Sequence, residues 1–85
     1  MEYDDAKTVV VNRLSAGSVP SLATNIKRML ACLIFDARVG MKTHCPPEPN
    51  DEREAAMHVR KMIAEGEIEE HMIDKRLYYS LPTLS

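Results

Sequence analysis

The residues with the greatest capacity for chemistry are two cysteines and three histidines. They are Cys32, His44, Cys45, His58 and His71. Thiolate and imidazole groups are the usual ligands of structural zinc, but such sites pair their ligands at close spacing, as in C-x-x-C. The adjacent His44 and Cys45 do not match that spacing, because neighbouring side chains rarely reach one ion together. We therefore expect no metal site and no cofactor.

Cys45 and a histidine could instead act as a nucleophile and its base. The sequence has no motif that would stabilise an oxyanion, and no third residue is placed to orient the histidine. A helical chain of 85 residues also leaves little room for a substrate pocket. We therefore predict no catalytic residues and no enzymatic activity.

A second group of residues has the chemistry to bind DNA. At helical spacing, Arg53, Met57, Arg60, Lys61 and Ala64 form a ridge roughly opposite the apolar side of the 51–65 segment. Arginine and lysine are the usual partners of DNA phosphates. The candidate DNA-binding residues are Arg53, Met57, His58, Arg60 and Lys61, with Lys75 and Arg76 at the predicted hairpin turn. The alternative interpretation is a solvated helix face with ion pairs.

The segment that follows Gly66 is acidic. Its glutamates either keep an exposed strand soluble and discourage edge pairing, or form a negative patch that docks on a basic partner protein. In the second interpretation the candidate protein-binding residues are Glu67, Glu69, Glu70, His71 and Tyr78.

Composition sets limits on both interpretations. The 85 residues, 45% of them hydrophobic, favour one small domain with a thin core. The net charge of -2 gives no overall basic signature for nucleic acid. Four basic residues against one acid give the segment 20–45 a net +3, and five against eight give the segment 50–81 a net -3. With three tyrosines, one phenylalanine and no tryptophan, a stacking platform for single strands is not expected.

Several features favour a cytoplasmic, reducing environment. The two cysteines do not resemble a disulfide framework, since Cys32 lies among apolar residues of a predicted helix. The N-terminus is acidic and lacks an apolar core, so we expect no signal peptide. No apolar run approaches the ~18 residues of a spanning helix, so we expect no membrane partner.

Apolar periodicity predicts three helices, at about residues 4–16, 21–37 and 51–65. The second has the clearest period, and Ser21 is placed to cap it. Pro46, Pro47 and Pro49 make the segment before the third helix a loop. The third helix is expected to begin at Asp51, with Glu54 as the other half of a capping box. A domain this small would also gain buried area from dimerisation.

A β-hairpin is predicted after Gly66, with strands at about 67–73 and 76–81. If Asp74 and Lys75 form the turn, Met72 lies opposite Leu77 and Glu70 lies opposite Tyr79. That register places one set of side chains against the helices: Ile68, Met72, Leu77, Tyr79 and Leu81. Asp-Lys is a weak two-residue turn sequence, so a longer loop is the alternative.

Three helices followed by a hairpin resemble the winged helix-turn-helix superfamily. The residues that carry the resemblance are VRKMIAEGEIEE at 59–70 and RLYYSLP at 76–82. They are similar to the end of a recognition helix and to two wing strands. The connection from Gly40 to Asn50 is longer than the tight turn usual in that family. The resemblance implies a mainly α, winged-helix-like domain whose third helix enters the major groove of double-stranded DNA, with the wing along the backbone or minor groove.

Two functions follow from these patterns. The first is a non-enzymatic DNA-binding protein, a small transcriptional regulator of a prokaryote, phage or mobile element. The second is a protein-protein interaction module on the same scaffold, such as a small phage-type inhibitor that docks through its acidic hairpin. Fold resemblance alone does not choose between them.

Overall fold

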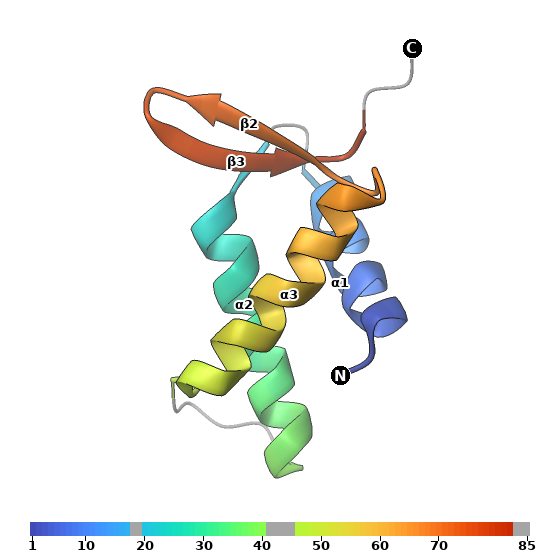
Figure 1. The fold of residues 1–85 in the computed structure, drawn as a ribbon, viewed down its shortest axis with the longest axis vertical. Helices are drawn as coiled ribbons and strands as arrows, with labels where there is room; N and C mark the ends of the chain where they lie inside the picture. Colours follow the sequence, from blue (N-terminus) through green and yellow to red (C-terminus); the bar gives the residue numbers. More distant parts are fainter. Residues whose placement is uncertain (18–19, 41–45, 83–85) are drawn as a thin grey trace.

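Three helices and a three-stranded antiparallel sheet make up the fold (Figure 1). The computed structural model describes residues 1–17, 20–40 and 46–82. The elements are α1 (Tyr3–Ser15), β1 (Ser21–Leu22), α2 (Ala23–Val39), α3 (Pro49–Ala64), β2 (Glu69–Ile73) and β3 (Arg76–Ser80). The sheet lies across one end of the helices, so the predicted class, mainly helical with a small β-hairpin, is confirmed. None of the helices in these ranges has the length and apolarity needed to cross a bilayer.

The apolar stripes of the three helices meet in one core. The central helix α2 contributes the most buried side chains, as its strong period predicted: Ala23, Ile26, Leu30, Ala31 and Ile34. Helices α1 and α3 add Ala6, Val10, Leu14, Ala55, Val59 and Met62. Ile68 and Tyr79, 1% and 2% exposed, attach the hairpin to the helices.

The sheet contains a strand that the sequence did not predict. β1 pairs with β3, with Ser21 opposite Tyr79 and Leu22 opposite Tyr78, and the strand order is β1-β3-β2. Ser21 therefore does not cap α2, which begins at Ala23 after Leu22. Two residues are too few to show the alternation by which a strand is recognised. The predicted two-stranded wing is thus a three-stranded sheet.

The hairpin has the predicted register, with Met72 opposite Leu77 and Glu70 opposite Tyr79. Asp74 and Lys75 form a two-residue turn, with φ angles of 50° and 66°. Two positive φ angles match the twist of the strands, so no longer loop is needed. Met72 is nevertheless 69% exposed and does not pack against the helices as predicted. The turn end of the hairpin projects past α2, where there is no helix to cover it (Figure 1).

Helix α3 begins two residues before the predicted start. Pro49 is its first residue, a position where the missing N–H of proline costs nothing. Asp51 Oδ2 accepts a hydrogen bond of 3.0 Å from the backbone N–H of Glu48, so Asp51 closes the capping box in place of Glu54. Glu54 instead lies 3.4 Å from the amino group of Met1.

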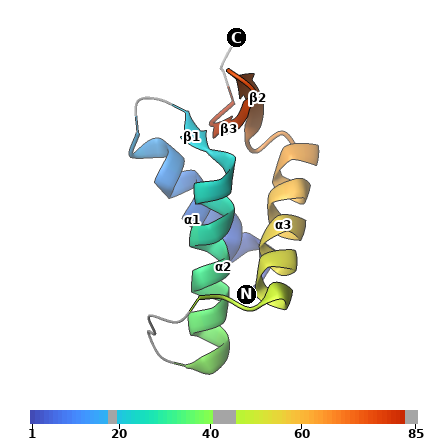
Figure 2. The same cartoon turned by 90° about the vertical axis from the view of Figure 1, so that its left-hand side faces the viewer.

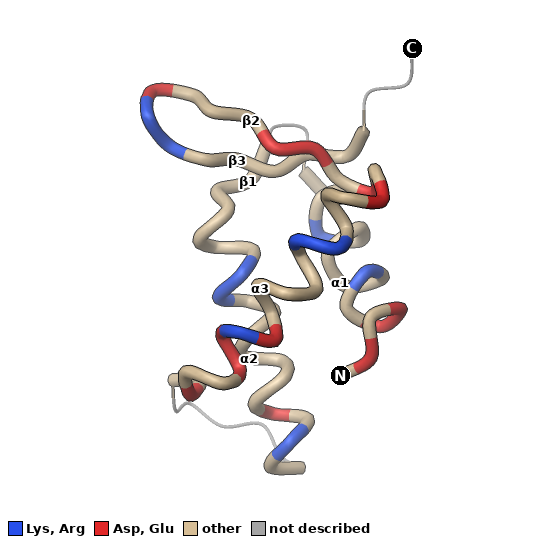
Figure 3. The backbone as a smooth tube through the Cα atoms, viewed as in Figure 1, with Lys and Arg blue, Asp and Glu red and all other residues tan. Residues whose placement is uncertain are grey.

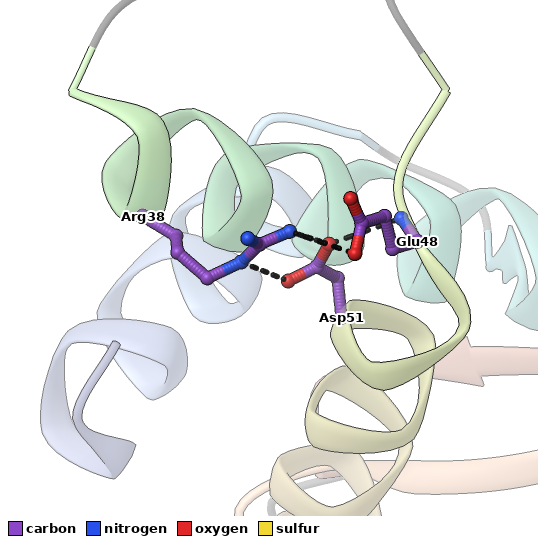
Figure 4. Close-up of polar contacts among 3 residues, drawn as sticks. All are labelled: Arg38, Glu48 and Asp51. Atoms are coloured by element: carbon purple, nitrogen blue, oxygen red, sulfur yellow. Dashed lines mark hydrogen bonds and ion pairs between the residues drawn. The ribbon is translucent and has the colours of Figure 1, made fainter.

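Asp51 also joins the end of α2 to the start of α3 (Figure 4). Arg38 donates hydrogen bonds of 3.2 Å and 3.0 Å to the two carboxylate oxygens of Asp51, which is only 3% exposed. Arg38 Nη2 lies 3.4 Å from Glu48 Oε2 as well. The hydrogen bonds from Arg38 and from the Glu48 backbone hold the pKa of Asp51 below its usual value. This ion-pair cluster fixes how the two helices meet.

Candidate nucleic-acid interface

The basic residues predicted on the third helix lie on the open side of α3. Arg53, Arg60 and Lys61 are exposed, and Met57 is 66% exposed. Figure 2 shows α3 along one side of the molecule, with α1 and α2 on its other side. The outer surface of α3 is therefore available to a partner.

The edge of α3 that faces α1 is occupied by contacts within the chain. Lys61 Nζ lies 4.2 Å from the ring centroid of Tyr3, which is a cation–π contact. His58 Nε2 lies 3.0 Å from the carbonyl oxygen of Met1. With the ion pair between Met1 and Glu54, these contacts attach the start of α1 to α3. Lys61 and His58, both predicted to bind DNA, thus have partners inside the fold.

The opposite edge of α3 borders a groove beside α2, beneath the hairpin. Its lower part is lined by Thr24, Lys27, Arg28 and Glu52. Its upper part is lined by Lys27, Ala56, Val59, Arg60, Ile63, Glu70, Leu77 and Tyr79. Because Lys27 lines both parts, we treat them as one groove. It brings two cations of α2 to the same side as Arg60 of α3.

Lys27 and Arg28 were missed as site residues by the sequence reasoning. They counted toward the +3 of the segment 20–45, but nothing local placed them near the third helix. Their place on the polar side of a strongly periodic helix was a usable signal. Only the packing of α2 beside α3 shows that they share a groove with Arg60.

Six cations form what we call the basic face. They are Lys27, Arg28, Arg53, Arg60, Lys75 and Arg76. Figures 1 and 2 show the turn end of the hairpin on the side where α2 and α3 lie next to each other, and Figure 3 shows Lys and Arg on all three elements. The acids that accompany them are Glu52, Glu70 and Asp74, so this region carries six basic and three acidic residues. The rest of the chain carries the remaining five basic and ten acidic residues.

The cations of the basic face lack the partners that Lys7, Arg38 and Lys61 have within the fold. Across residues 1–17, 20–40 and 46–82, no member of the basic face makes an ion pair, and Arg53 makes one hydrogen bond of 3.4 Å to Asn50. Elsewhere, Arg38 is paired with Asp51, and Lys7 Nζ lies 3.9 Å from Glu67 Oε1. Six cations without an ion pair in these ranges therefore lie on this side, whereas Arg13, which also has none, lies in the last turn of α1.

The acidic residues of the hairpin do not gather in the same way. Glu67 is near Lys7 of α1, and Glu69 Oε2 lies 3.8 Å from His71 Nε2. Glu70 lines the groove with Lys27, on the other face of the strand from Glu69. Tyr78 lies opposite His71 in the register. These acids therefore do not present a single negative patch.

One pair on the hairpin has the distance of a nucleophile and its base. Ser80 Oγ lies 2.7 Å from His71 Nε2, and Glu69 approaches the same ring nitrogen. A catalytic triad needs its carboxylate at the other nitrogen, where it orients the ring. Ser80 also donates a 3.2 Å hydrogen bond to the Leu81 carbonyl. This arrangement acts as a cross-strand polar contact.

Metal-binding residues do not cluster in the part of the chain that the structure describes. There, no three side chains of His, Cys, Asp or Glu come together in a way that could hold an ion. His44 and Cys45, the pair singled out in the sequence, lie outside the described residues.

Comparison with known proteins gives no relative: no family model, no curated protein and no solved structure matches this chain. Its function must therefore be argued from the geometry above.

Proposed function

We propose that this chain is a non-enzymatic, winged-helix-like protein that binds double-stranded DNA and acts in the cytoplasm as a small transcriptional regulator. The observation that carries the proposal is the absence of ion pairs, among the described residues, for the six cations of the basic face. In this arrangement α3 enters the major groove with Arg53, Met57 and Arg60 toward the bases. Lys27, Arg28 and the hairpin turn then lie toward the phosphates.

DNA binding at the basic face depends on local charge rather than on the net charge of the chain. At physiological ionic strength the Debye length is about 8 Å, so exposed charges on the far side of the domain are largely screened. The net charge of -2 thus does not oppose binding at a face where cations outnumber acids by six to three. Cations without internal partners can neutralise phosphates and release counterions without first breaking a contact in the fold.

A titration with salt tests the proposal. Binding of a fluorescently labelled random-sequence duplex is measured by anisotropy between about 50 and 200 mM salt. If the four cations directed toward the phosphates each neutralise one, log K should fall against log salt with a slope of about -3.6. The variant with Lys27, Arg28 and Arg60 changed to Ala should lose about two units of that slope, because Arg60 is directed toward the bases, whereas R13A should lose none. Arg13 is exposed at the end of α1, outside the basic face. Lack of binding even at the lowest salt would contradict the proposal.

A second candidate is a protein-protein interaction module. The observation that favours it is the exposure of Met72 and Ile73, 69% and 44%, which are consecutive residues of β2 near the hairpin turn and so present apolar side chains on both faces of the strand. Exposed apolar surface of this kind often marks a protein contact. In this case binding to a partner survives the triple alanine variant and is lost when Met72 and Ile73 are changed to Ser.

A further inference from the structure

Met57 is the one large apolar side chain of the described part of α3 that the fold leaves in solvent. It is 66% exposed, whereas Val59 and Met62 of the same helix are 2% and 0% exposed. It stands four residues after Arg53 and three before Arg60, in the middle of the charged ridge. A side chain with so little cover contributes little to the core, so its role is to be sought in what it meets outside the chain.

The spacing of this ridge suits the edges of successive base pairs. Arg60 comes seven positions after Arg53, and a helix rises about 1.5 Å per residue, so the ridge spans about 10 Å. That equals about three base-pair steps of 3.4 Å. A helix fits into the major groove, which is about 12 Å wide. The ridge therefore presents a cation, an apolar group and a cation to a short run of base pairs.

Major-groove chemistry offers one matching partner for each of these groups. Arginine pairs with the O6 and N7 acceptors of guanine, and the C5-methyl of thymine is the apolar group on that edge. The flexible thioether side chain of methionine can adapt to a small apolar target.

From this geometry we infer that Met57 is a specificity-determining residue that contacts a thymine C5-methyl group. The inference rests on the proposed function, and it adds the class of site: a thymine with guanine on either side within about three base-pair steps. Arg53 and Arg60 read the guanines, and Met57 between them reads the methyl.

The test removes the methyl group and nothing else. Duplexes bound by the wild-type protein are enriched from a random-sequence library, and the enriched duplex is synthesised with thymine or with deoxyuridine at each thymine position in turn. Affinity is measured for the wild type, M57A, M57L and M72A. Met72 is the matched control, because it is the same residue type and is 69% exposed, but lies on the hairpin.

The wild type and M72A should bind the thymine duplex about fourfold more tightly at one position, the effect of burying one methyl group. M57L should keep this preference, and M57A should bind both duplexes equally. The inference would be overturned, while the proposed function stands, by either of two results. The wild type prefers thymine over deoxyuridine at no position, or M57A keeps the preference. If no duplex is bound in a salt-sensitive manner, the proposed function fails and the inference with it.

Discussion

Arg60 and Lys61 are neighbours in the sequence, yet α3 directs them to opposite edges of the same helix. Lys61 lies over the ring of Tyr3 at 4.2 Å and so belongs to the contact between α1 and α3. Arg60 lines the groove beside α2 with Lys27 and has no ion-pair partner among the described residues. The comparison teaches that counting charges on a helix does not locate an interface. What matters is whether the fold already supplies a partner for each charge.

The cation–π contact between Lys61 and the ring of Tyr3 should not depend on the ionisation of Tyr3 at physiological pH. Burial, and then the neighbouring Glu65 carboxylate, raise the pKa of Tyr3 to about 12. The phenol is therefore neutral throughout the physiological range, and its ring presents the same face to Lys61. Cations that have partners in the fold should affect stability when they are replaced, and the unpaired cations of the basic face should affect DNA affinity.

Charge reversal in the groove should give the largest difference between the effect on DNA affinity and the effect on stability. Changing Lys27, Arg28 and Arg60 together to Glu should lower DNA affinity on the order of 100-fold at moderate salt, because two phosphate contacts and one base contact are replaced by repulsive charges. The Tm should change by a few degrees at most, since none of the three forms an ion pair in the described part of the fold and the new repulsion with Glu52 and Glu70 is screened at these exposed side chains. Anisotropy and thermal denaturation measure the two quantities. A loss of affinity of about fivefold in R13E, which makes one third of the charge change, would show that only net charge matters.

Replacing Arg38 should lower stability and leave DNA binding unchanged, because Arg38 has partners in the fold. R38A leaves the buried carboxylate of Asp51 without its cation and separates the ends of α2 and α3. The Tm should fall by about 10 °C, a size typical of losing a structural polar contact in a small domain. Calorimetry measures the change. The salt slope of DNA binding at low temperature should not change, and a reduced slope would place Arg38 in the interface.

Lowering the pH should weaken the contact between Arg38 and Asp51, with a smaller effect on the Tm than R38A has. The pKa of Asp51 is lowered in the folded chain, first by its hydrogen bonds with Arg38. A carboxylate with a lowered folded pKa contributes stability above its unfolded pKa, and that contribution is lost as pH falls through the folded value. Between about pH 5 and 3 the Tm of the wild type should therefore fall more steeply than that of D51N. E52Q, which alters an exposed neighbour, should follow the wild type; parallel curves for D51N and wild type would contradict this role.

The sequence predicted those parts of the fold that repeat locally. The period of α2 fixed its buried face, and alternation around Asp74 and Lys75 gave the correct hairpin register. It missed β1, because two residues carry no period and their partner strand lies more than fifty residues later. It placed Met72 on the correct face of the strand, but it could not show that the hairpin extends past α2.

Of the candidate site, too, the sequence predicted the local spacing of residues but not the contacts between elements. Helical spacing placed Arg53, Met57 and Arg60 on one exposed ridge of α3. It could not show that Lys61 and His58 contact the first residues of the chain, because such pairs depend on tertiary packing. Helical spacing also could not predict that Lys27 and Arg28 line the groove, since the arrangement of α2 beside α3 is a property of the whole core.

The most direct test of the account compares R60A with K61A, two substitutions one residue apart. R60A should lower DNA affinity about tenfold, because it loses a base contact, and leave the Tm unchanged. K61A should lower the Tm by a few degrees, since it loses a cation–π contact, and leave the DNA affinity unchanged. Equal losses of affinity for the two variants, or a loss for K61A alone, would contradict the division of α3 into an edge that serves the fold and an edge that serves DNA.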